Sequence, residues 1–200
     1  MSISIFDYGA GNLRSVENTL DALGVRYELI RDAESIQKAT KLILPGVGHF
    51  GQMMRALDAM QVRDALIDTI HRGIPFLGIC LGLQALFTGS DEAPEEHGLK
   101  IFDGKVLRFA TQLRVPHMGW NHLQALRPSR LLNGLDSTPY LYFAHSYYAP
   151  VTHASSAVCE YAVPFTAVLE HKNVCGVQFH PEKSGDLGLR IVKNFVERVC

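Results

Sequence analysis

The sequence lacks the features that mark membrane, secreted or nucleic-acid-binding proteins. No apolar run reaches the length of a membrane span, and the first residues do not form the basic and then apolar segment of a signal peptide. The formal net charge is only −1, so no basic surface for nucleic acid or anionic lipid is indicated. We therefore expect a globular protein of the cytoplasm that binds neither nucleic acid nor membrane.

Cysteine is also scarce, and its spacing excludes two kinds of site. The four cysteines show no CxxC pair, so they predict neither a zinc site nor a disulfide framework. Nine histidines are present, but no HxH or HxxxH pair falls on an expected helix or strand. We expect no metal and no cofactor. The cysteines are Cys80, Cys159, Cys175 and Cys200.

Length and pattern predict one α/β domain spanning residues 1–200. Hydrophobic residues make up 47% of the chain and charged residues 20%, which is typical of a globular protein. In the first half, short apolar strands alternate with amphipathic helical segments. This alternation predicts a mostly parallel sheet with helices on both faces. The expected strands are 2–6, 27–30 and 42–44, and the expected helices are 13–23 and 53–72, the second with a break near Met60.

The second half is richer in strand pattern and predicts additional antiparallel strands. A last helix is expected at 187–199, and the acidic run 91–96 is expected to be a solvated loop. The expected strands are 99–108, 119–123, 140–143, 157–162, 166–169 and 174–178.

One stretch of the chain has the pattern of a nucleophile turn. Residues 75–84 begin as an apolar strand and continue as a helix, and Cys80 at the junction has glycine two positions before and two after it. Such a turn would expose the sulfur at a helix N-terminus, where thiolate is favoured. The alternative is that Cys80 is a small buried core residue.

A base for such a cysteine is available near the end of the chain. His180 and Glu182 flank a proline after an apolar strand, and side chains two apart in extended structure point the same way. A Cys–His–Glu set would let the base activate the nucleophile while the carboxylate orients the base. The alternative is an ordinary His-Pro turn beside an exposed glutamate.

Two further turns directly follow expected strands and should lie at the same edge of the sheet as Cys80. One is Asp7-Tyr8-Gly9 and the other is Pro45-Gly46-Val47-Gly48. The glycines around Val47 could expose its N–H to a developing oxyanion, and the N–H of Leu81 is a second candidate. A plain strand-to-helix turn would also explain these glycines.

Together these segments resemble the class I glutamine amidotransferases, which are triad glutaminases of flavodoxin-like fold. The resemblance rests on GICLGLQ, GVQFHPEKS and PGVG, and it extends over essentially the whole chain. The segments DYGAGNLRS, VPHMGWN and YFAHSYY are similar to one branch of that family. In that branch a glutaminase subunit passes ammonia to a cyclase subunit in histidine biosynthesis.

The resemblance implies that the chain hydrolyses glutamine to glutamate and ammonia through a thioester. It implies Cys80 as nucleophile, His180 as base and Glu182 as the residue that orients the base. Val47, Gly48 and Leu81 would form the oxyanion hole. Glutamine would be held by Gln84, Glu92 and the backbone around His145, Ser146 and Tyr147.

The resemblance also implies a partner, a (β/α)8-barrel cyclase subunit that forms a heterodimer with this chain and receives the ammonia. Trp120 would be an aromatic anchor there, although the only tryptophan could instead be a core residue. Asn12 would face the partner or else cap a helix. The residues implied at the interface are Asn12, Pro116, His117, Met118, Trp120 and Asn121.

Three other functions stay open at this point. The chain could be the glutaminase subunit of another amidotransferase, or a cysteine hydrolase of the same fold acting on a different amide. It could also be a binding subunit that kept the fold and lost the chemistry.

Overall fold

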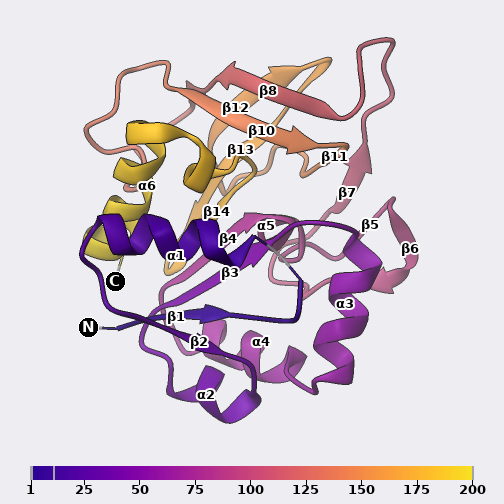
Figure 1. Ribbon diagram of the computed structural model, residues 1–200. Helices are drawn as coiled ribbons and strands as arrows, with labels where there is room; N and C mark the ends of the chain where they lie inside the picture. The colour runs from indigo at the N-terminus through magenta and orange to yellow at the C-terminus, as the bar shows by residue number, and fades with distance from the viewer. Residues whose placement is uncertain (1, 11, 200) are drawn as a thin grey trace.

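The computed structural model describes residues 2–10 and 12–199, so Gly11 of the DYGAGNLRS segment and Cys200 lie outside the described residues. Within those residues the main sheet has eight strands, in the order β2-β1-β3-β4-β14-β13-β12-β9 (Figure 1). The first five strands in this order are parallel to one another. They are β1 (Ile3–Phe6), β2 (Tyr27–Ile30), β3 (Leu42–Gly46), β4 (Phe76–Cys80) and β14 (Val174–Val177).

This strand order confirms the predicted mostly parallel sheet. With β14 as the fifth parallel strand, the order is the 2-1-3-4-5 of flavodoxin-like folds. Every residue of β1, β3, β4 and β14 is buried, as expected for parallel strands that have helices on both faces. The predicted strands 2–6, 27–30, 42–44 and 174–178 are confirmed to within two residues.

The second half of the chain extends this sheet with antiparallel strands, as predicted. β13 (Val163–His171) pairs with β14 on one side and β12 (Ser155–Tyr161) on the other, and β9 (Gln124–Ala125) forms the edge. Two smaller sheets lie beyond it. One pairs β8 (His117–His122) with β10 (Tyr140–His145). The other contains β5 (Gly89–Ser90), β6 (Ala93–His97), β7 (Lys105–Arg108) and β11 (Tyr147–Tyr148).

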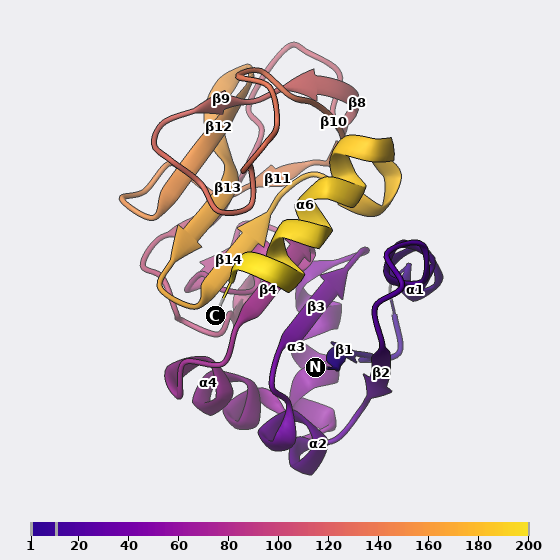
Figure 2. The same ribbon diagram turned by 90° about the vertical axis from the view of Figure 1, so that its left-hand side faces the viewer.

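Helices cover both faces of the main sheet (Figure 2). α1 (Leu13–Ala22) and α6 (Gly185–Arg198) lie on one face, and α2 (Ala33–Lys38), α3 (Phe50–Ala59) and α4 (Arg63–His71) lie on the other. Neighbouring strand residues face opposite sides, so Ile43 belongs to one apolar core and Leu44 to the other. None of the helices in the described part of the chain has the length and apolar character that a membrane span requires.

Local expectations differ from the structure in several places, and the strand expected at 99–108 forms only over Lys105–Arg108. The expected helix 53–72 is two helices, and the break near Met60 is confirmed, with Gln61 at a φ of 56°. α2 was not predicted, because it is short and only Ile36 on it is buried. The acidic run 91–96 is not a solvated loop: Ala93–His97 is a strand, Ala93 is buried, and Glu96 accepts a hydrogen bond from Arg55 at 2.8 Å.

Lys41 joins the start of β3 to the end of the last helix. Its side chain is fully buried, and its Nζ donates to the carbonyl oxygens of Phe195, Val196 and Val199 at 3.1, 2.8 and 2.5 Å. The last carbonyls of a helix have no partner within it, and a cation there also complements the helix dipole. Lys41 therefore fixes α6 against the sheet.

Candidate active site

Cys80 stands at a sharp turn between a buried strand and a single helical turn. It ends β4 and precedes α5 (Leu81–Gln84). Its φ of 53° and ψ of −104° form a conformation that residues with a side chain rarely adopt. Only 6% of the residue is exposed. The predicted turn from strand to helix within residues 75–84 is confirmed.

The two glycines that flank Cys80 are required by close packing, and neither has a positive φ. A Cβ on Gly82 would lie 2.0 Å from the carbonyl oxygen of Leu44, and a Cβ on Gly78 would lie 2.5 Å from that of Gly82. A side chain at either position would push the nucleophile turn away from β3. The backbone strain of the turn is thus carried by Cys80 itself.

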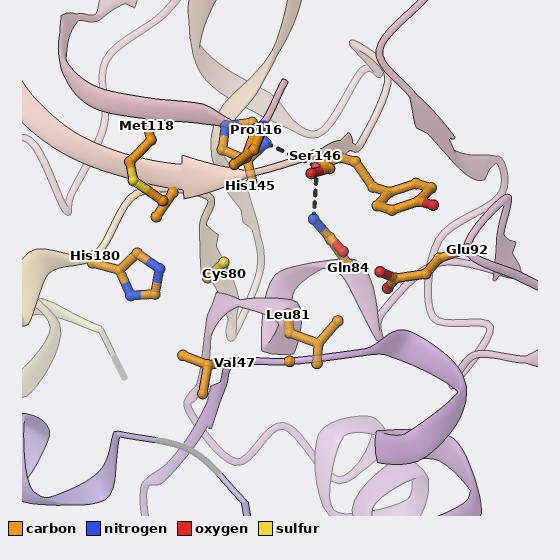
Figure 3. Close-up of a pocket in the computed structure, with 13 residues that line it drawn as sticks. Val47, Cys80, Leu81, Gln84, Glu92, Pro116, Met118, His145, Ser146 and His180 are labelled. Carbon is orange, nitrogen blue, oxygen red and sulfur yellow. Dashed lines mark hydrogen bonds between the residues drawn. The ribbon is translucent and has the colours of Figure 1, made fainter. Parts of the chain in front are cut away.

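His180 and Glu182 lie together just after β14. Imidazole Nδ1 is 2.8 Å from Glu182 Oε1, and both side chains are 3% exposed. We expected the two residues in extended backbone, but Pro181–Lys183 forms a 3-10 helix (η1), and this turn brings the carboxylate to the ring. Figure 3 shows the ring turned toward Cys80.

Opposing effects set the pKa of His180. Burial lowers the pKa of the imidazole. The charge of the Cys80 sulfur and its hydrogen bond with the ring, followed by the hydrogen bond and charge of Glu182, raise this pKa to about 10. The raising effects prevail, so His180 is an imidazolium at neutral pH. A protonated ring beside the sulfur can supply a proton to a leaving group.

Gln178 contacts the nucleophile and was not among the predicted site residues. Its Nε2 donates to Cys80 Sγ at 3.5 Å, and its Oε1 accepts from Gln84 Nε2 at 3.1 Å. The residue is fully buried. A glutamine inside the apolar run 174–179 was the signal that could have marked it, because a buried amide needs partners for its polar atoms.

The Pro-Gly-Val-Gly turn lies directly against the nucleophile turn. Gly46 pairs with Cys80 across β3 and β4. Val47, Gly48 and Leu81 line the same pocket as the sulfur. The N–H of Leu81 opens α5 and so has no acceptor within the helix. The structure thus brings the three predicted oxyanion residues together around Cys80.

Tyr8 holds this turn, and sequence reasoning gave it a place at the sheet edge but no role. Its hydroxyl donates to the carbonyl oxygen of Val47 at 3.4 Å. Burial raises the pKa of the phenol to about 12, although the hydrogen bond to Val47 lowers it. Tyr8 therefore remains a neutral donor over the whole physiological range.

A pocket of about 190 Å³ lies over Cys80 (Figure 3). It combines the strand ends of the main sheet with the end of β10 and the start of β11, and Ala144 of β10 was not predicted to be part of it. The predicted site residues that line it are Val47, Gly48, Cys80, Leu81, Gln84, Glu92, Pro116, Met118, His145, Ser146, Tyr147 and His180.

Two of the residues expected to bind glutamine also hold backbone groups. Gln84 Nε2 donates to the carbonyl oxygen of Tyr147 at 2.8 Å. Glu92 Oε2 accepts from the N–H of Phe50, the first residue of α3, at 2.7 Å. This contact fixes the Glu92 carboxylate at the pocket wall and leaves its Oε1 for a ligand.

His117 and His145 face each other inside the molecule. They are opposite one another in β8 and β10, and His117 Nδ1 lies 3.2 Å from His145 Nε2. Burial lowers the pKa of His117 to about 4 and that of His145 to about 3, so both rings are neutral. His117 stays a predicted interface residue, but its side chain is turned inward: the residue is only 4% exposed, because alternate residues of β8 point to opposite faces.

The outward positions of β8 carry Met118 and Trp120, which are 59% and 45% exposed. Trp120 stacks on Tyr140 with ring centroids 5.8 Å apart, so it is not a core residue. Met118 and Pro116 also line the pocket, and this outer surface therefore borders it. Asn121 points the other way and donates to the carbonyl oxygen of Glu160 at 3.1 Å.

Asn12 occupies the N-cap position of α1, but its side chain makes no capping hydrogen bond. The helix-cap alternative is therefore wrong for this side chain. Its place at a partner interface stays a prediction.

The other cysteines and acidic groups form no further cluster within residues 2–10 and 12–199. Cys159 and Cys175 are buried free thiols, as is Cys80. Burial raises the pKa of Cys159 to about 12, so that thiol stays protonated at neutral pH. No three His, Cys, Asp or Glu side chains in these ranges lie together as metal ligands would.

Comparison with known proteins finds relatives along the whole chain. The sequence profile of the family "Glutamine amidotransferase class-I" matches residues 4–199. A protein of Methanothermobacter thermautotrophicus named imidazole glycerol phosphate synthase subunit HisH is 46% identical over 196 residues, which is 98% of each chain. A protein of the same name from Desulfitobacterium hafniense is 44% identical over 195 residues, covering 96% of this chain and 92% of that one.

A solved structure of a glutamine amidotransferase has the same fold. It superposes with a TM-score of 0.76 at 19% sequence identity, covering 98% of this chain and 97% of the other. At that identity the likeness supports the fold alone, and it agrees with the strand order described above.

Proposed function

This chain belongs to the class-I glutamine amidotransferase family, and on that premise we propose that it is the glutaminase subunit of imidazole glycerol phosphate synthase, an enzyme of histidine biosynthesis. The observation that carries the proposal is 46% identity across 98% of both chains with a relative of that name. The pocket supports it, because a cysteine, a histidine and a carboxylate in this arrangement suit hydrolysis of an amide.

In the first step, the Cys80 sulfur attacks the side-chain amide carbon of glutamine. The carbonyl oxygen becomes an oxyanion, and the N–H groups of Val47 and Leu81 are the donors that we propose for it. His180 is protonated by virtue of its raised pKa and gives its proton to the amide nitrogen. Ammonia then leaves, and a γ-glutamyl thioester on Cys80 remains.

In the second step, His180 has lost its proton and acts as a base. It takes a proton from water, whose oxygen attacks the thioester carbon and forms glutamate as the sulfur leaves. Glu182 keeps Nδ1 of the ring engaged throughout, so the other ring nitrogen serves the reaction. One imidazole therefore supplies the acid of the first step and the base of the second.

We place the amino-acid end of glutamine at the side of the pocket that contains Glu92. The carboxylate there is held by Phe50 N–H through one oxygen, and the other can accept from the α-ammonium group. Gln84 and the backbone at Ser146 and Tyr147 form the remaining wall. Cys80 lies at the opposite end, where the side-chain amide would reach it (Figure 3).

The partner we propose is a (β/α)8-barrel cyclase subunit that uses the ammonia. Ammonia in neutral water is mostly ammonium, which is no nucleophile, so a productive transfer needs a sheltered route between two active sites. Met118 and Pro116 line the pocket while Met118 and Trp120 are exposed beside it, so a partner bound there would cover the pocket rim. The assembled enzyme would work in the cytoplasm.

The proposal is tested by assaying glutamate release with and without the barrel subunit and its nucleotide ligand. We expect partner and ligand to accelerate release, and we expect Cys80→Ala to remove it by several orders of magnitude, as loss of a nucleophile does. Release that survives Cys80→Ala, or that ignores both partner and ligand, would contradict the proposal.

A second assay separates this function from that of a cysteine hydrolase with another substrate. A glutamine analogue that alkylates thiols should label Cys80 stoichiometrically, and free glutamine should block the labelling. Labelling at Cys80 that glutamine does not slow would point to a different amide.

A further inference from the structure

The carbonyl oxygen of Tyr147 is the common acceptor of two hydrogen bonds at the pocket wall. His145 Nδ1 lies 2.8 Å from it, and Gln84 Nε2 donates to it at 2.8 Å. Both bonds are drawn in Figure 3, where two dashed lines meet at one oxygen. A carbonyl can only accept, so His145 must carry its proton on Nδ1, and the Gln84 amide must point its NH₂ toward Tyr147.

The proton position on His145 fixes the donors and acceptors of the hydrogen bonds toward β8. A neutral His145 with its proton on Nδ1 offers Nε2 as an acceptor, so the bond at 3.2 Å is donated by His117 Nδ1. His117 Nε2 is then an acceptor, and Asn121 Nδ2 lies 3.4 Å from it. The Asn121 amide is oriented independently, because its Oδ1 accepts from the N–H of His122 at 2.8 Å.

The orientation of the Gln84 amide fixes the donors and acceptors of the hydrogen bonds toward Cys80. The second N–H of the Gln84 amide donates to Gln178 Oε1 at 3.1 Å. The amide of Gln178 must therefore present its NH₂ to Cys80, where Nε2 donates to Sγ at 3.5 Å. Every donor along the path meets an acceptor, and His145 from one side and Gln84 from the other both hold the carbonyl oxygen of Tyr147 in place.

We propose that this path of hydrogen bonds from Asn121 to Cys80 orients the nucleophile and favours its anionic form, with Gln178 as a catalytic residue that contacts the sulfur and His117 as a positioning residue. The inference deepens the proposed glutaminase function and rests on it for the reaction served. A donor aimed at the sulfur stabilises thiolate over thiol, since a charged acceptor makes the stronger hydrogen bond.

Because these side chains are buried, only one set of ring and amide orientations satisfies all of their polar atoms. His117, His145, Gln84 and Gln178 are each at most 6% exposed, so an amide or ring turned the other way would leave an unpaired polar group away from water. The neutral state of both histidines is also required, because an imidazolium at either position would place two donors face to face. The lowered pKa values of both rings are consistent with that requirement.

The test measures how fast iodoacetamide alkylates Cys80 as a function of pH in the full chain, with the Cys80 peptide quantified by mass spectrometry. Gln178→Met keeps the length of the side chain and removes both polar contacts. We expect labelling at neutral pH to slow about tenfold, the effect of one hydrogen bond to a charged group, and the pH midpoint to rise by about one unit.

A second variant at the far end of the path keeps the test decisive if one protein fails to fold. His117→Phe preserves a ring that stacks on Tyr161, as His117 does with centroids 4.1 Å apart. We expect a smaller rise of the midpoint. His117→Asn, whose amide can replace the Nδ1–H donor, should move the midpoint back toward that of the wild type.

Val192→Ala is the matched control, because Val192 belongs to the same apolar core as Cys80 but takes part in none of the hydrogen bonds of the path. It should lower the midpoint of thermal unfolding without moving the alkylation midpoint. Wild-type midpoints in both Gln178→Met and His117→Phe would overturn the proposal, as would an equal shift in Val192→Ala. Alkylation needs neither glutamine nor a partner, so its outcome is independent of whether the proposed function holds.

Discussion

At the scale of single residues, neighbouring charges affect the pKa of His180 more than burial does. An imidazole inside a protein ordinarily loses its proton more easily than in water. Here the Cys80 sulfur and the Glu182 carboxylate reverse that tendency. The ring thus enters the reaction as an acid, and only after ammonia has left does it become the base.

A first prediction follows for the ring of His180. Cys80→Ala removes the two largest effects that raise its pKa, so we expect the pKa of His180 to fall from about 10 to a clearly lower value. Glu182→Gln should lower it less. NMR titration of the ring in the three proteins measures this, and a pKa in Cys80→Ala equal to that of the wild type would show that the sulfur has no part in it.

The same shift predicts how stability depends on pH. His180 has a pKa near 6.5 when unfolded and about 10 when folded, so the folded chain binds the proton more tightly. The stabilisation is complete below about pH 6.5 and is lost as the pH rises toward 10. Urea unfolding of the wild type and His180→Asn should therefore show a stability gap that narrows with rising pH. A gap that widens would contradict the sign.

Sequence reasoning reached the residues that carry chemistry and missed those that support them. Cys80, His180 and Glu182 stand in short patterns whose spacing has a chemical meaning. Tyr8 and Gln178 act through contacts with residues 39 and 98 positions away. No local pattern reports such a contact, because it exists only once the strands are side by side.

At the scale of single elements, the nucleophile turn depends on how closely α5 approaches β3. We predict that Gly82→Ala destabilises the protein by more than about 3 kcal/mol, since its Cβ would overlap the carbonyl oxygen of Leu44 at 2.0 Å. Gly89→Ala is the control, because its Cβ would meet only one atom within 4 Å, at 3.3 Å. Urea unfolding measures both, and equal losses would refute the packing argument.

The last helix provides a second prediction at this scale. Lys41→Met should cost about 2 kcal/mol, because buried carbonyl oxygens at the end of α6 lose a charged donor. Lys193→Met lies on the same helix, where its exposed pair with Glu197 at 3.8 Å should contribute less than about 0.5 kcal/mol. A comparable free energy of unfolding for both variants would argue against the role of Lys41.

Elements were predictable where one face is strongly apolar. The strands of the parallel sheet are buried along their length, so their limits follow from the apolar runs. α2 buries only Ile36, and β6 buries only Ala93, while its glutamates pair with Arg55 of α3. Neither segment can be told from a loop by its sequence pattern, because its stabilising contacts come from residues far away in the chain.

At the scale of the whole molecule, the small sheet of β8 and β10 carries the outer surface that we assign to the partner. We predict that Met118→Ala combined with Trp120→Ala weakens binding of the barrel subunit about 30-fold, as truncation of an aromatic anchor does. Both side chains are largely exposed, so thermal stability should hardly change.

Leu29→Ala is the control for that measurement. Leu29 is 43% exposed on β2, at the far edge of the main sheet, and its loss should leave the affinity unchanged. Titration calorimetry with the purified partner compares the three proteins. Equal affinities for all of them would place the partner elsewhere.

The fold class was predictable from the sequence, but the register between the strands of the second half was not. Alternating strands and helices predicted a parallel sheet, and the strand-rich second half predicted additional antiparallel strands. Which side of β8 faces inward depended on its register with β10, which sets His117 opposite His145. A shift of one residue would have exchanged Trp120 and His117 between the two faces.

The position of β14 beside β4 has a consequence for how the enzyme is made. The ribosome completes β4 and Cys80 long before it reaches Val174, where β14 begins. Until then the nucleophile ends a strand with an open edge, and His180 and Glu182 do not yet exist. A nascent chain therefore carries the thiol without the histidine that serves as its acid. It can hydrolyse glutamine only after nearly the whole protein has been synthesised and β14 has paired with β4.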